Sequence, residues 1–235
     1  MWQKKNPECA FFASRQIQAN IPERLDGAGD IYHISGLAWR HYYNLPQKQF
    51  GHQLEKVFST CGAAALYLRE DFLQAGGFDE DFFSYYEDVD LGFRLRLKGY
   101  RSLYVPEAVV HHVGSVTFGE RSDFVYYYLQ RNLIWTFVKN MPSAMLWRYL
   151  PAHILANLFH LLYFTLHGRG RLAWQAKYDA VKELSMIFEK RRVIQKGIKS
   201  TSSELLRTME RGWLQPYLLG HQLRRIRRSE GLPPK

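Results

Sequence analysis

The sequence predicts an α/β fold followed by a helical region, and three observations support this prediction. Residues 57–68, VFSTCGAAALYL, form an apolar run of mostly small residues that is typical of a buried strand. Residues 84–98 carry apolar side chains at helical spacing, and YRSLYVP over 100–106 is strand-like again. From Ser122 onward the pattern is aromatic and helical. We therefore expect strands and helices first, and helices alone afterwards.

We divide the chain accordingly into an α/β half over residues 1–120 and a basic, aromatic-rich helical half over 121–235. Residues 1–56 show no strong periodicity but several turn signals, so we expect loops with short elements there. The N-terminus, MWQKKNPECA, is polar and lacks the apolar run of a signal peptide. Only Cys9 and Cys61 are present, which argues against a disulfide scaffold or a multi-cysteine zinc site and favours a reducing compartment.

Two short elements are expected between residues 57 and 77. A buried strand through residues 61–65 contains Gly62 and Ala63, which leave space for a ligand or a neighbouring chain. A buried helix has the same apolar signature and is the alternative. A short helix over residues 70–75 follows, and Gly76-Gly77 ends it.

A longer helix is predicted from Ser84, which is the expected N-cap, with Glu87 three residues later as in a capping box. Its apolar face repeats at i, i+4 and i+8, at Val89, Phe93 and Leu97. Gly99 ends this helix. We then expect a strand, or a strand that passes into a loop, over PEAVVHHVGS at residues 106–115.

The helical half contains the most hydrophobic stretch of the chain, residues 143–167, after a first helix that Pro142 breaks. Polar or helix-bending residues interrupt this stretch, whereas a clean membrane span needs ~20 mostly apolar residues. The interruptions are Arg148, Pro151, His153, Asn157 and His160. We therefore expect an amphipathic or re-entrant helix that lies on a membrane surface, with an ordinary buried core helix as the alternative.

Charge is divided unequally between the two halves. Residues 1–120 hold 12 Lys and Arg against 15 Asp and Glu, a net of −3, whereas residues 121–235 hold 20 against 7, a net of +13. A basic half indicates an anionic partner, such as membrane headgroups, nucleic acid or phosphorylated substrates. A solvated basic surface without a partner is the alternative.

Six carboxylates crowd into the stretch GGFDEDFFSYYEDVDLGFRLRLKGY, residues 76–100. On a helix Asp88 and Asp90 point about 200° apart, so they cannot face one site. Asp90 lies four residues before Arg94, the spacing of a stabilising ion pair. Asp88 has no such partner, and Gly92 leaves room beside it, so it suits a general base; a solvated acidic helix start is the alternative. The turn carboxylates are expected to cap the next element: Asp79, Glu80 and Asp81.

These carboxylates belong to a longer, ordered series of motifs. The series comprises Gly76-Gly77-Phe78-Asp79-Glu80, Phe83, Tyr86-Glu87-Asp88-Val89-Asp90-Leu91, Arg94, Gly99-Tyr100, Val105-Pro106-Glu107-Ala108 and His112. The flanking motifs are Arg131-Asn132, Lys139-Asn140-Met141-Pro142 and Lys190-Arg191-Arg192. The whole series resembles the C-terminal half of family 2 glycosyltransferases, in particular the rhamnosyltransferase-like members that build bacterial cell-surface polysaccharides.

The resemblance implies a GT-A fold, an α/β sandwich with a nucleotide-binding half and an acceptor half. It implies transfer of a sugar from a nucleotide donor to a hydroxyl with inversion, usually with Mg²⁺ or Mn²⁺. The Glu-Asp motif of the family corresponds to Glu87-Asp88, with Asp88 as the base that deprotonates the acceptor hydroxyl. His112, unlike its neighbour His111, matches a position that completes metal coordination.

The resemblance also assigns substrate-binding residues and partners. Gly62 and Ala63 match the strand that lines the sugar pocket, and Arg131 is assigned to substrate binding as well. The implied partners are a UDP- or dTDP-sugar donor, a glycan or lipid-linked acceptor, and the membrane surface. The implied location is peripheral, at the cytoplasmic face of the bacterial inner membrane, and rhamnose is the implied sugar.

The N-terminal part of the chain differs from the full-length family pattern. Full-length members begin with a hydrophobic strand and a nucleotide-binding half, which includes a metal-binding Asp-x-Asp after a buried strand. We expect no such strand before residue 57. The Asp88-Val89-Asp90 sequence begins a helix instead of following a buried strand, so we do not assign it as the metal-binding Asp-x-Asp. We therefore expect a partial GT-A fold without the main metal ligands, with a separate N-terminal half as a candidate partner.

Two hypotheses for the function follow. The first is a glycosyltransferase, or its acceptor half, at the membrane. The second is a non-catalytic membrane-associated remnant or scaffold that keeps the fold but lacks the donor site. Nucleic-acid binding through the basic half is not expected, because no nucleic-acid motif accompanies the basic residues.

Overall fold

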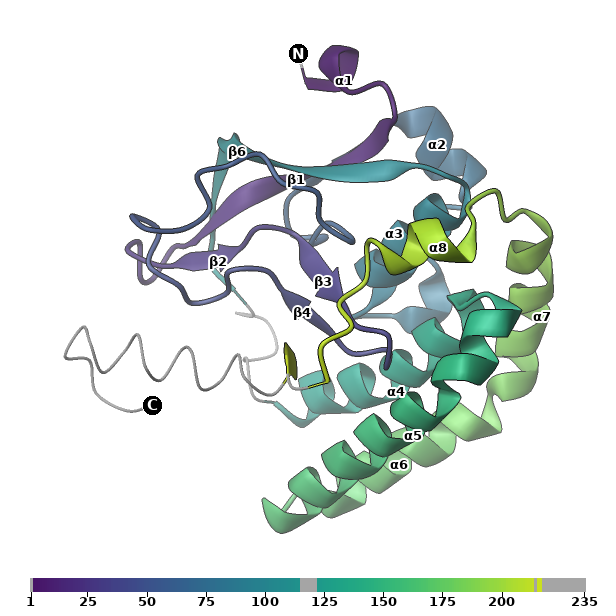
Figure 1. Cartoon of the computed structure of the whole chain (residues 1–235). Helices are drawn as coiled ribbons and strands as arrows, with labels where there is room; N and C mark the ends of the chain where they lie inside the picture. The colour runs from purple at the N-terminus through teal and green to yellow at the C-terminus, as the bar shows by residue number, and fades with distance from the viewer. Residues whose placement is uncertain (1, 115–121, 214, 217–235) are drawn as a thin grey trace.

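The computed structural model describes residues 2–114, 122–213 and 215–216. Its sheet is built around β1 (Cys9–Gln18), which lies beside β6 (Arg101–His112) in parallel (Figure 1). Along the other edge of β1, β5 (Ala65–Tyr67) and β2 (Leu25–Gly27) pair antiparallel with different parts of the strand. The sheet is therefore mixed, with the parallel pair as its longest ladder.

β1 corrects two expectations. We expected residues 1–56 to form loops with short elements, and we expected no apolar strand before residue 57. The first five residues of β1, CAFFA, are all buried, as expected for a strand covered on both faces. The second half of the strand, SRQIQ, is polar, and Gln16 is nevertheless fully buried. That polar half broke the apolar pattern, so the strand was missed.

A two-stranded hairpin lies next to this sheet, formed by β3 (Asp30–Tyr32) and β4 (Ala38–Arg40). Tyr32 stacks on Phe58 with ring centroids 4.7 Å apart and meets Phe93 edge-on. The hairpin is thus held against the helix that contains Phe93, and it carries Asp30 and Arg40 toward the same region.

The helices of the α/β half are α1 (Trp2–Lys5), α2 (Arg69–Gln74) and α3 (Glu87–Leu97), with a 3₁₀ turn, η1 (Glu80–Phe82), between α2 and α3. The predicted short helix at 70–75 is confirmed, and it ends at Gly76 and Gly77, whose φ values are +86° and +63°. Positive φ is a conformation that glycine adopts without strain.

Two predicted boundaries in this region are wrong. The strand expected over residues 61–65 lies at Ala65–Tyr67, and the preceding residues form a turn instead. The helix expected from Ser84 begins at Glu87, and Tyr86 is its N-cap without a side-chain capping bond. The predicted capping box between Ser84 and Glu87 therefore does not form.

The buried side of α3 is wider than the predicted stripe. Val89, Phe93 and Leu97 enter the main core as predicted, and Leu91 and Leu95 pack against Phe11 of β1. Gly92 does not leave room for a ligand, because a Cβ there would lie 2.5 Å from Cβ of Ser59. Its role is to let α3 approach the segment before β5 closely.

The helical half contains α4 (Asp123–Asn140), α5 (Ser143–Leu166), α6 (Gly170–Lys182), α7 (Leu184–Lys196) and α8 (Ser202–Leu206). α4 packs against α3, α6 and α7. One apolar cluster includes Tyr32 and Phe93 from the α/β half and Trp135, Phe137 and Ile187 from the helical half. The division at residue 120 therefore does not separate two independent cores. That residues 1–120 and 121–235 have different functions stays a prediction.

The most hydrophobic stretch forms the single helix α5, and only 17% of its most apolar window is buried. α5 and α6 project from the rest of the molecule as a helical pair (Figure 1). Among the described residues α5 alone is long and apolar enough to cross a membrane by length and composition. The alternative of an ordinary buried core helix is excluded, because most large apolar side chains of α5 face outward.

Candidate active site

A cavity of about 280 Å³ lies at the N-terminal end of α3, between the β3–β4 hairpin, the turn after Cys61 and the end of β6. The hairpin, the turn after Cys61, the start of α3 and the end of β6 all contribute lining residues. The lining brings together five residues predicted as site residues: Gly62, Ala63, Glu87, Asp88 and His112. Arg131, the sixth, is not among the lining residues.

Asp88 is held by two backbone donors. Its Oδ2 accepts a hydrogen bond from the N–H of Gly62 at 2.8 Å, and its Oδ1 accepts one from the N–H of Val89 at 2.8 Å. Burial raises the pKa of Asp88, while these two bonds and the positive charge of Arg40 oppose that rise. The carboxylate is therefore fixed in direction at the wall of the cavity.

Two further carboxyl groups share this region. Burial, and then the negative charge of Asp88, raise the pKa of Asp30 to about 8 and that of Glu87 to about 7. Asp30 Oδ2 accepts a bond from the Ser59 hydroxyl at 2.9 Å, whereas Oε2 of Glu87 is buried without a hydrogen-bond partner in the described chain. Because close carboxylates cannot all ionise, the three groups share protons, and Asp88 has the most donors to stabilise its charge.

His112 also lines this cavity and takes part in a chain of polar contacts. Its Nδ1 contacts Oδ2 of Asp26 at 2.7 Å, and the guanidinium of Arg40 binds the same oxygen. Asp26 therefore fixes the orientation of the His112 ring, and Arg40 compensates the charge of Asp26.

The metal expected from the resemblance does not fit the described residues by themselves. Within residues 2–114, 122–213 and 215–216, no group of three or more His, Cys, Asp and Glu side chains could hold a metal ion. The carboxylate nearest to His112 is bound by Arg40, whose positive charge opposes a cation at that oxygen. His112 remains a predicted ligand, and no step of the chemistry below is assigned to a metal.

The segment before α3 is strained, and this strain sets where Glu87 and Asp88 lie. Phe83, Tyr85 and Tyr86 have φ values of 61°, 64° and 69°, each of which costs about 1–3 kcal/mol for a non-glycine residue. Asn132 of α4 opposes this cost, because its Nδ2 donates to the carbonyls of Phe82, Ser84 and Tyr85 at 2.7–2.9 Å. We call residues 82–86 with this side chain the Asn132 clamp.

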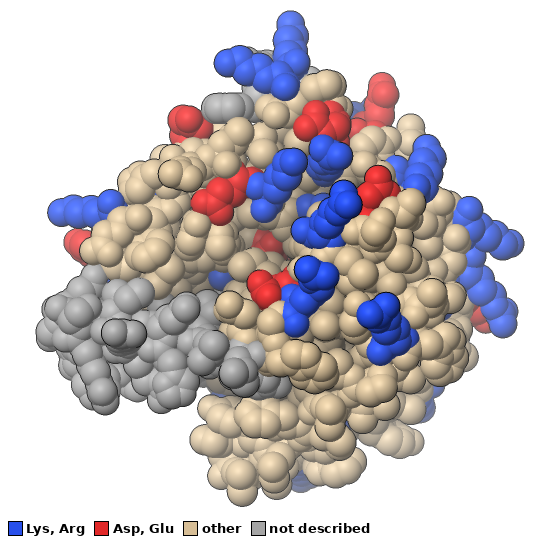
Figure 2. All heavy atoms as spheres, in the orientation of Figure 1, with Lys and Arg blue, Asp and Glu red and all other residues tan. Residues whose placement is uncertain are grey.

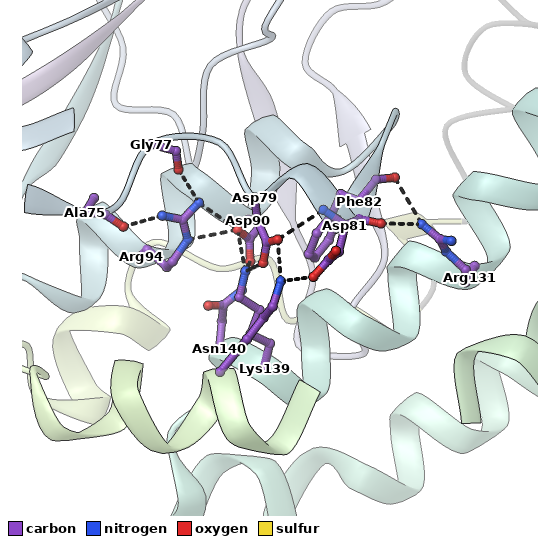
Figure 3. A network of polar contacts seen from close by, with 11 residues as sticks. Ala75, Gly77, Asp79, Asp81, Phe82, Asp90, Arg94, Arg131, Lys139 and Asn140 are labelled. Atoms are coloured by element: carbon purple, nitrogen blue, oxygen red, sulfur yellow. Dashed lines mark hydrogen bonds and ion pairs between the residues drawn. The ribbon is translucent and has the colours of Figure 1, made fainter. Parts of the chain in front are cut away.

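Arg131 supports the same segment from its other end. Its Nη2 donates to the carbonyls of Asp81 and Phe82 at 2.8 and 3.1 Å, and its guanidinium lies 4.0 Å from the ring centre of Trp135 (Figure 3). The side chain is buried. Arg131 does not line the cavity, and its guanidinium holds the backbone of Asp81 and Phe82 instead. Its predicted contact with substrate stays a prediction.

Asp90 has the structural role that its spacing predicted, within a larger network. It binds Arg94 at 2.8 Å, and also Lys139 at 2.9 Å and Asn140 at 2.7 Å (Figure 3). Burial raises the pKa of Asp90, but Arg94 and Lys139 outweigh burial and hold it below its usual value. The predicted pair with Arg94 is confirmed, and the bonds to α4 were invisible because they join residues 49 and 50 positions apart.

Of the three turn carboxylates predicted to cap the next element, Asp79 does so, whereas Asp81 pairs with Lys190 instead. Asp79 caps η1 by accepting from the N–H of Asp81, and it pairs with Lys139 and Lys190. Burial raises the pKa of Asp79, but the two lysines outweigh it and lower the value to about 2. The network of Asp79, Asp90, Arg94, Lys139 and Lys190 therefore ties α3 to α4 and α7, which fixes the helix that carries Asp88.

Sequence reasoning missed three residues of the site. Asp30 and Arg40 lie on the hairpin and reach the cavity only through tertiary packing. Asn132 was part of a recognised motif but had no assigned role. A buried asparagine in a mostly apolar helix is the sequence signal for such a role, because its amide must find hydrogen-bond partners.

Comparisons with known proteins identify the family of the chain. The model of the glycosyl transferase family group 2 matches residues 30–176. N-acetylglucosaminyl-diphospho-decaprenol L-rhamnosyltransferase of Mycobacterium tuberculosis (strain ATCC 25618 / H37Rv) is 56% identical over 52 residues, which is 22% of this chain and 17% of the relative. Rhamnosyltransferase WbbL of Escherichia coli (strain K12) is 42% identical over 53 residues, 22% of this chain and 20% of the relative.

A more distant relative is the O-antigen biosynthesis protein RfbC of Myxococcus xanthus, 33% identical over 92 residues, 36% of this chain and 7% of the relative. The matched stretches thus span a fifth or less of the length of each of these relatives. The family match, in contrast, includes the hairpin, the cavity, α3 and α4, and it extends over more than half of the chain. The chain therefore belongs to glycosyl transferase family group 2.

Proposed function

We propose that this chain provides the catalytic base and the acceptor side of an inverting sugar transfer. The observation that carries the proposal is the Asp88 carboxylate, held by the N–H groups of Gly62 and Val89 at the wall of a cavity. A general base must be ionised, accessible and fixed, and two backbone donors on a rigid helix start provide this.

The proposed step is a single displacement. Asp88 accepts the proton of the acceptor hydroxyl while that oxygen forms a bond to the anomeric carbon of the donor sugar. The bond from this carbon to the diphosphate breaks, and the configuration inverts because entry and departure occur on opposite faces. Asp30 and Glu87, whose pKa values are raised to about 8 and about 7, hold protons near neutral pH. They therefore limit the negative charge beside Asp88.

The donor and the acceptor are proposed from the relatives. Two of these are named rhamnosyltransferases, and the name of one specifies an N-acetylglucosaminyl-diphospho-decaprenol acceptor. We propose rhamnose from a nucleotide donor as the sugar, and a lipid-linked or glycan hydroxyl as the acceptor. The proposal includes a divalent metal only as a family property, because the described residues do not form its site.

We further propose a peripheral location at the cytoplasmic face of the bacterial inner membrane. The support is α5, whose outward side carries exposed apolar residues along its length: Trp147, Leu155, Leu158, Leu162 and Leu166. Trp174 and Tyr178 of the adjacent α6 are exposed too, and aromatic side chains of this kind suit the membrane interface. A lipid-linked acceptor would be met at such a surface.

Calorimetry and a transfer assay test the proposed function. We expect dTDP-rhamnose to bind the full chain saturably with Mn²⁺ present, and Asp88→Asn to retain this binding while it loses transfer to a lipid-linked acceptor. If neither dTDP- nor UDP-sugars bind, the chain keeps the fold without the donor site, and the non-catalytic alternative replaces the proposal.

A further inference from the structure

A second polar cavity, of about 410 Å³, lies at the C-terminal end of α3. Segments far apart in sequence form it, because Lys199 N–H donates to the carbonyl of Leu97 at 2.8 Å and the Ser200 hydroxyl donates to the carbonyl of Arg96. α8 and the start of β6 complete its wall. Leu97, at the end of α3, lies nine residues after Asp88, so at 1.5 Å per residue this cavity lies about 14 Å along the helix from Asp88.

Five cationic side chains line this space, which we call the basic cavity: Lys56, Arg96, Arg101, Lys199 and Arg207. The single carboxylate in the lining, Glu204, is already bound to the backbone N–H and the hydroxyl of Thr201 at 2.8 Å each. Figure 2 shows Lys and Arg gathered on the face that carries α8. The positive charge of the cavity is therefore in large excess.

The exposed cations of the basic cavity form no direct ion pair among the described residues, although the charges of Arg101 and Arg207 act on the nearby Glu204 carboxylate. Lys56, Arg101, Lys199 and Arg207 make neither an ion pair nor a side-chain hydrogen bond there. Like charges repel, so bringing four such groups to one concave surface costs free energy unless an anion is present.

Arg96 adds an independent observation. Its side chain is only 4% exposed, and it donates to the carbonyls of Phe58 and Val57 and to the Ser102 hydroxyl, but to no carboxylate. Its Nη1 has no hydrogen-bond partner in the described chain. Burial, assisted by the charge of Arg101, lowers the pKa of Arg96 to about 9. A buried guanidinium without an anion is costly, and an anion in the adjoining cavity would offset that cost.

We propose that the basic cavity binds a phosphate-bearing anion, such as a phosphate monoester or a diphosphate. Arg and Lys together suit phosphate, because the guanidinium offers paired donors and the ammonium offers a compact charge. The hydroxyls of Ser102, Ser200 and Thr208 also line the cavity, but each donates its proton to a backbone carbonyl, so the five cations would provide the contacts to the anion. A concave space of this volume fits a small phosphate group rather than an extended nucleic acid.

Two sources of this ligand share the same chemistry, a soluble phosphate compound and the headgroup of an anionic lipid. The basic cavity lies at the other end of α3 from the candidate active site, and none of its lining residues lines that site. The proposal is therefore independent of the proposed function, and it stands or fails without any assay of sugar transfer.

The test measures binding of inorganic pyrophosphate to the full chain by isothermal titration calorimetry. We expect saturable binding, and a loss of roughly tenfold or more in affinity for Lys199→Glu/Arg207→Glu, because two cations of the lining are replaced by anions that repel the ligand. The matched control, Lys4→Glu/Lys48→Glu, makes the same change of net charge at exposed positions outside the basic cavity and outside α5 and α6. We expect it to bind as the wild type does, and thermal unfolding checks that both variants fold.

A second arm uses flotation with phosphatidylcholine vesicles that contain phosphatidylglycerol. If the cavity variant alone loses salt-sensitive vesicle binding while pyrophosphate does not bind, the ligand is a lipid headgroup. If pyrophosphate binding is lost in the cavity variant alone, the ligand is a soluble phosphate compound. Three outcomes would overturn the proposal: the control variant loses as much binding as the cavity variant, the cavity variant binds both probes as the wild type does, or neither probe binds the wild type.

Discussion

Asp88 and Asp90 lie two positions apart and have different roles, because the helix directs them to different sides of α3. Asp90 is fully buried among Arg94, Lys139 and Asn140, so its charge belongs to the network that joins α3 to α4. Asp88 is half-buried at the cavity and binds only backbone N–H groups. A carboxylate that binds no cation directly remains able to accept a proton.

The two aspartates provide a matched pair of variants. Asp88→Asn should abolish sugar transfer and change the free energy of unfolding little, because burial already disfavours the charge at this position. Asp90→Asn should lower the free energy of unfolding by about 3–5 kcal/mol, because it leaves Arg94 buried without its anion and Lys139 with Asp79 alone. Urea denaturation and a transfer assay measure both. Equal loss of activity in two stably folded variants would contradict this division of roles.

At the scale of elements, the strained segment before α3 determines where the catalytic motif lies. Three residues with positive φ occur within four positions, and the amide of Asn132 binds three carbonyls of the same segment. The cost of the strain is offset by α4, which is itself in the core. The position of Asp88 therefore depends on a side chain 44 residues away in sequence.

Asn132→Ala should release the Asn132 clamp. Because three carbonyls lose their donor, we expect the free energy of unfolding to fall by about 1–3 kcal/mol and the turnover number to fall more than the affinity for the donor. The control on the same helix is Thr136→Val, which removes a buried hydroxyl without a hydrogen bond and should be neutral or stabilising. Unchanged turnover in a stable Asn132→Ala variant would show that the clamp does not position Asp88.

The helical pair contains a buried cation without a carboxylate partner. Lys177 of α6 donates to the carbonyl of Gln130 at 3.0 Å and to the side chain of Asn157, and burial lowers its pKa to about 7. His153 and His160 face the same cluster, and burial, followed by the charge of Lys177 for His160, lowers the pKa of each to about 4. This polar interior makes the stability of the helical pair depend on pH.

The sign of this dependence follows from proton binding. The pKa of Lys177 is about 7 in the folded chain and 10.5 for an ordinary lysine, so between these values the unfolded chain binds more protons and this residue makes stability rise with pH. We expect Lys177→Met to remove that rise and the exposed control Lys182→Met to retain it, in urea denaturation at several pH values. A wild-type curve parallel to that of Lys177→Met over this range would show that Lys177 stays charged in the folded protein.

At the scale of the whole molecule, the two halves are joined through α4 into one core, to which α5 and α6 contribute one side each while the outer side of α5 stays exposed (Figure 1). This arrangement separates the cavity at Asp88 from the exposed apolar side of α5. The same core therefore fixes the position of the cavity at Asp88 relative to the exposed apolar side of α5.

The membrane contact predicts a specific loss on substitution. Leu158 and Leu162 are 56% and 58% exposed, so Leu158→Glu/Leu162→Glu should leave folding intact and reduce vesicle binding at least about tenfold. The control, Leu54→Glu/Leu73→Glu, changes two exposed leucines outside α5. Flotation with lipid vesicles measures both. If the two double variants bind vesicles equally, α5 is not the membrane contact.

Local patterns predicted the elements whose signals lie in neighbouring residues. The helix at 70–75, the buried face of α3, the strand after Gly99 and the pair of Asp90 with Arg94 all depend on contacts within a few positions. The strand β1 was missed because half of it is polar although it is buried. The start of α3 was misplaced because bonds from α4, not a local cap, fix the preceding backbone.

The sequence by itself determined the family motif, the separation of Asp88 from Asp90 and the basic character of the C-terminal half, since these depend on residue order, helical spacing and composition. Only the tertiary structure decided which groups surround Asp88, that Arg131 supports backbone, and that five cations from distant segments share one cavity. The physical reason is that burial, strain and charge clustering depend on contacts between residues tens of positions apart. No local pattern records such contacts.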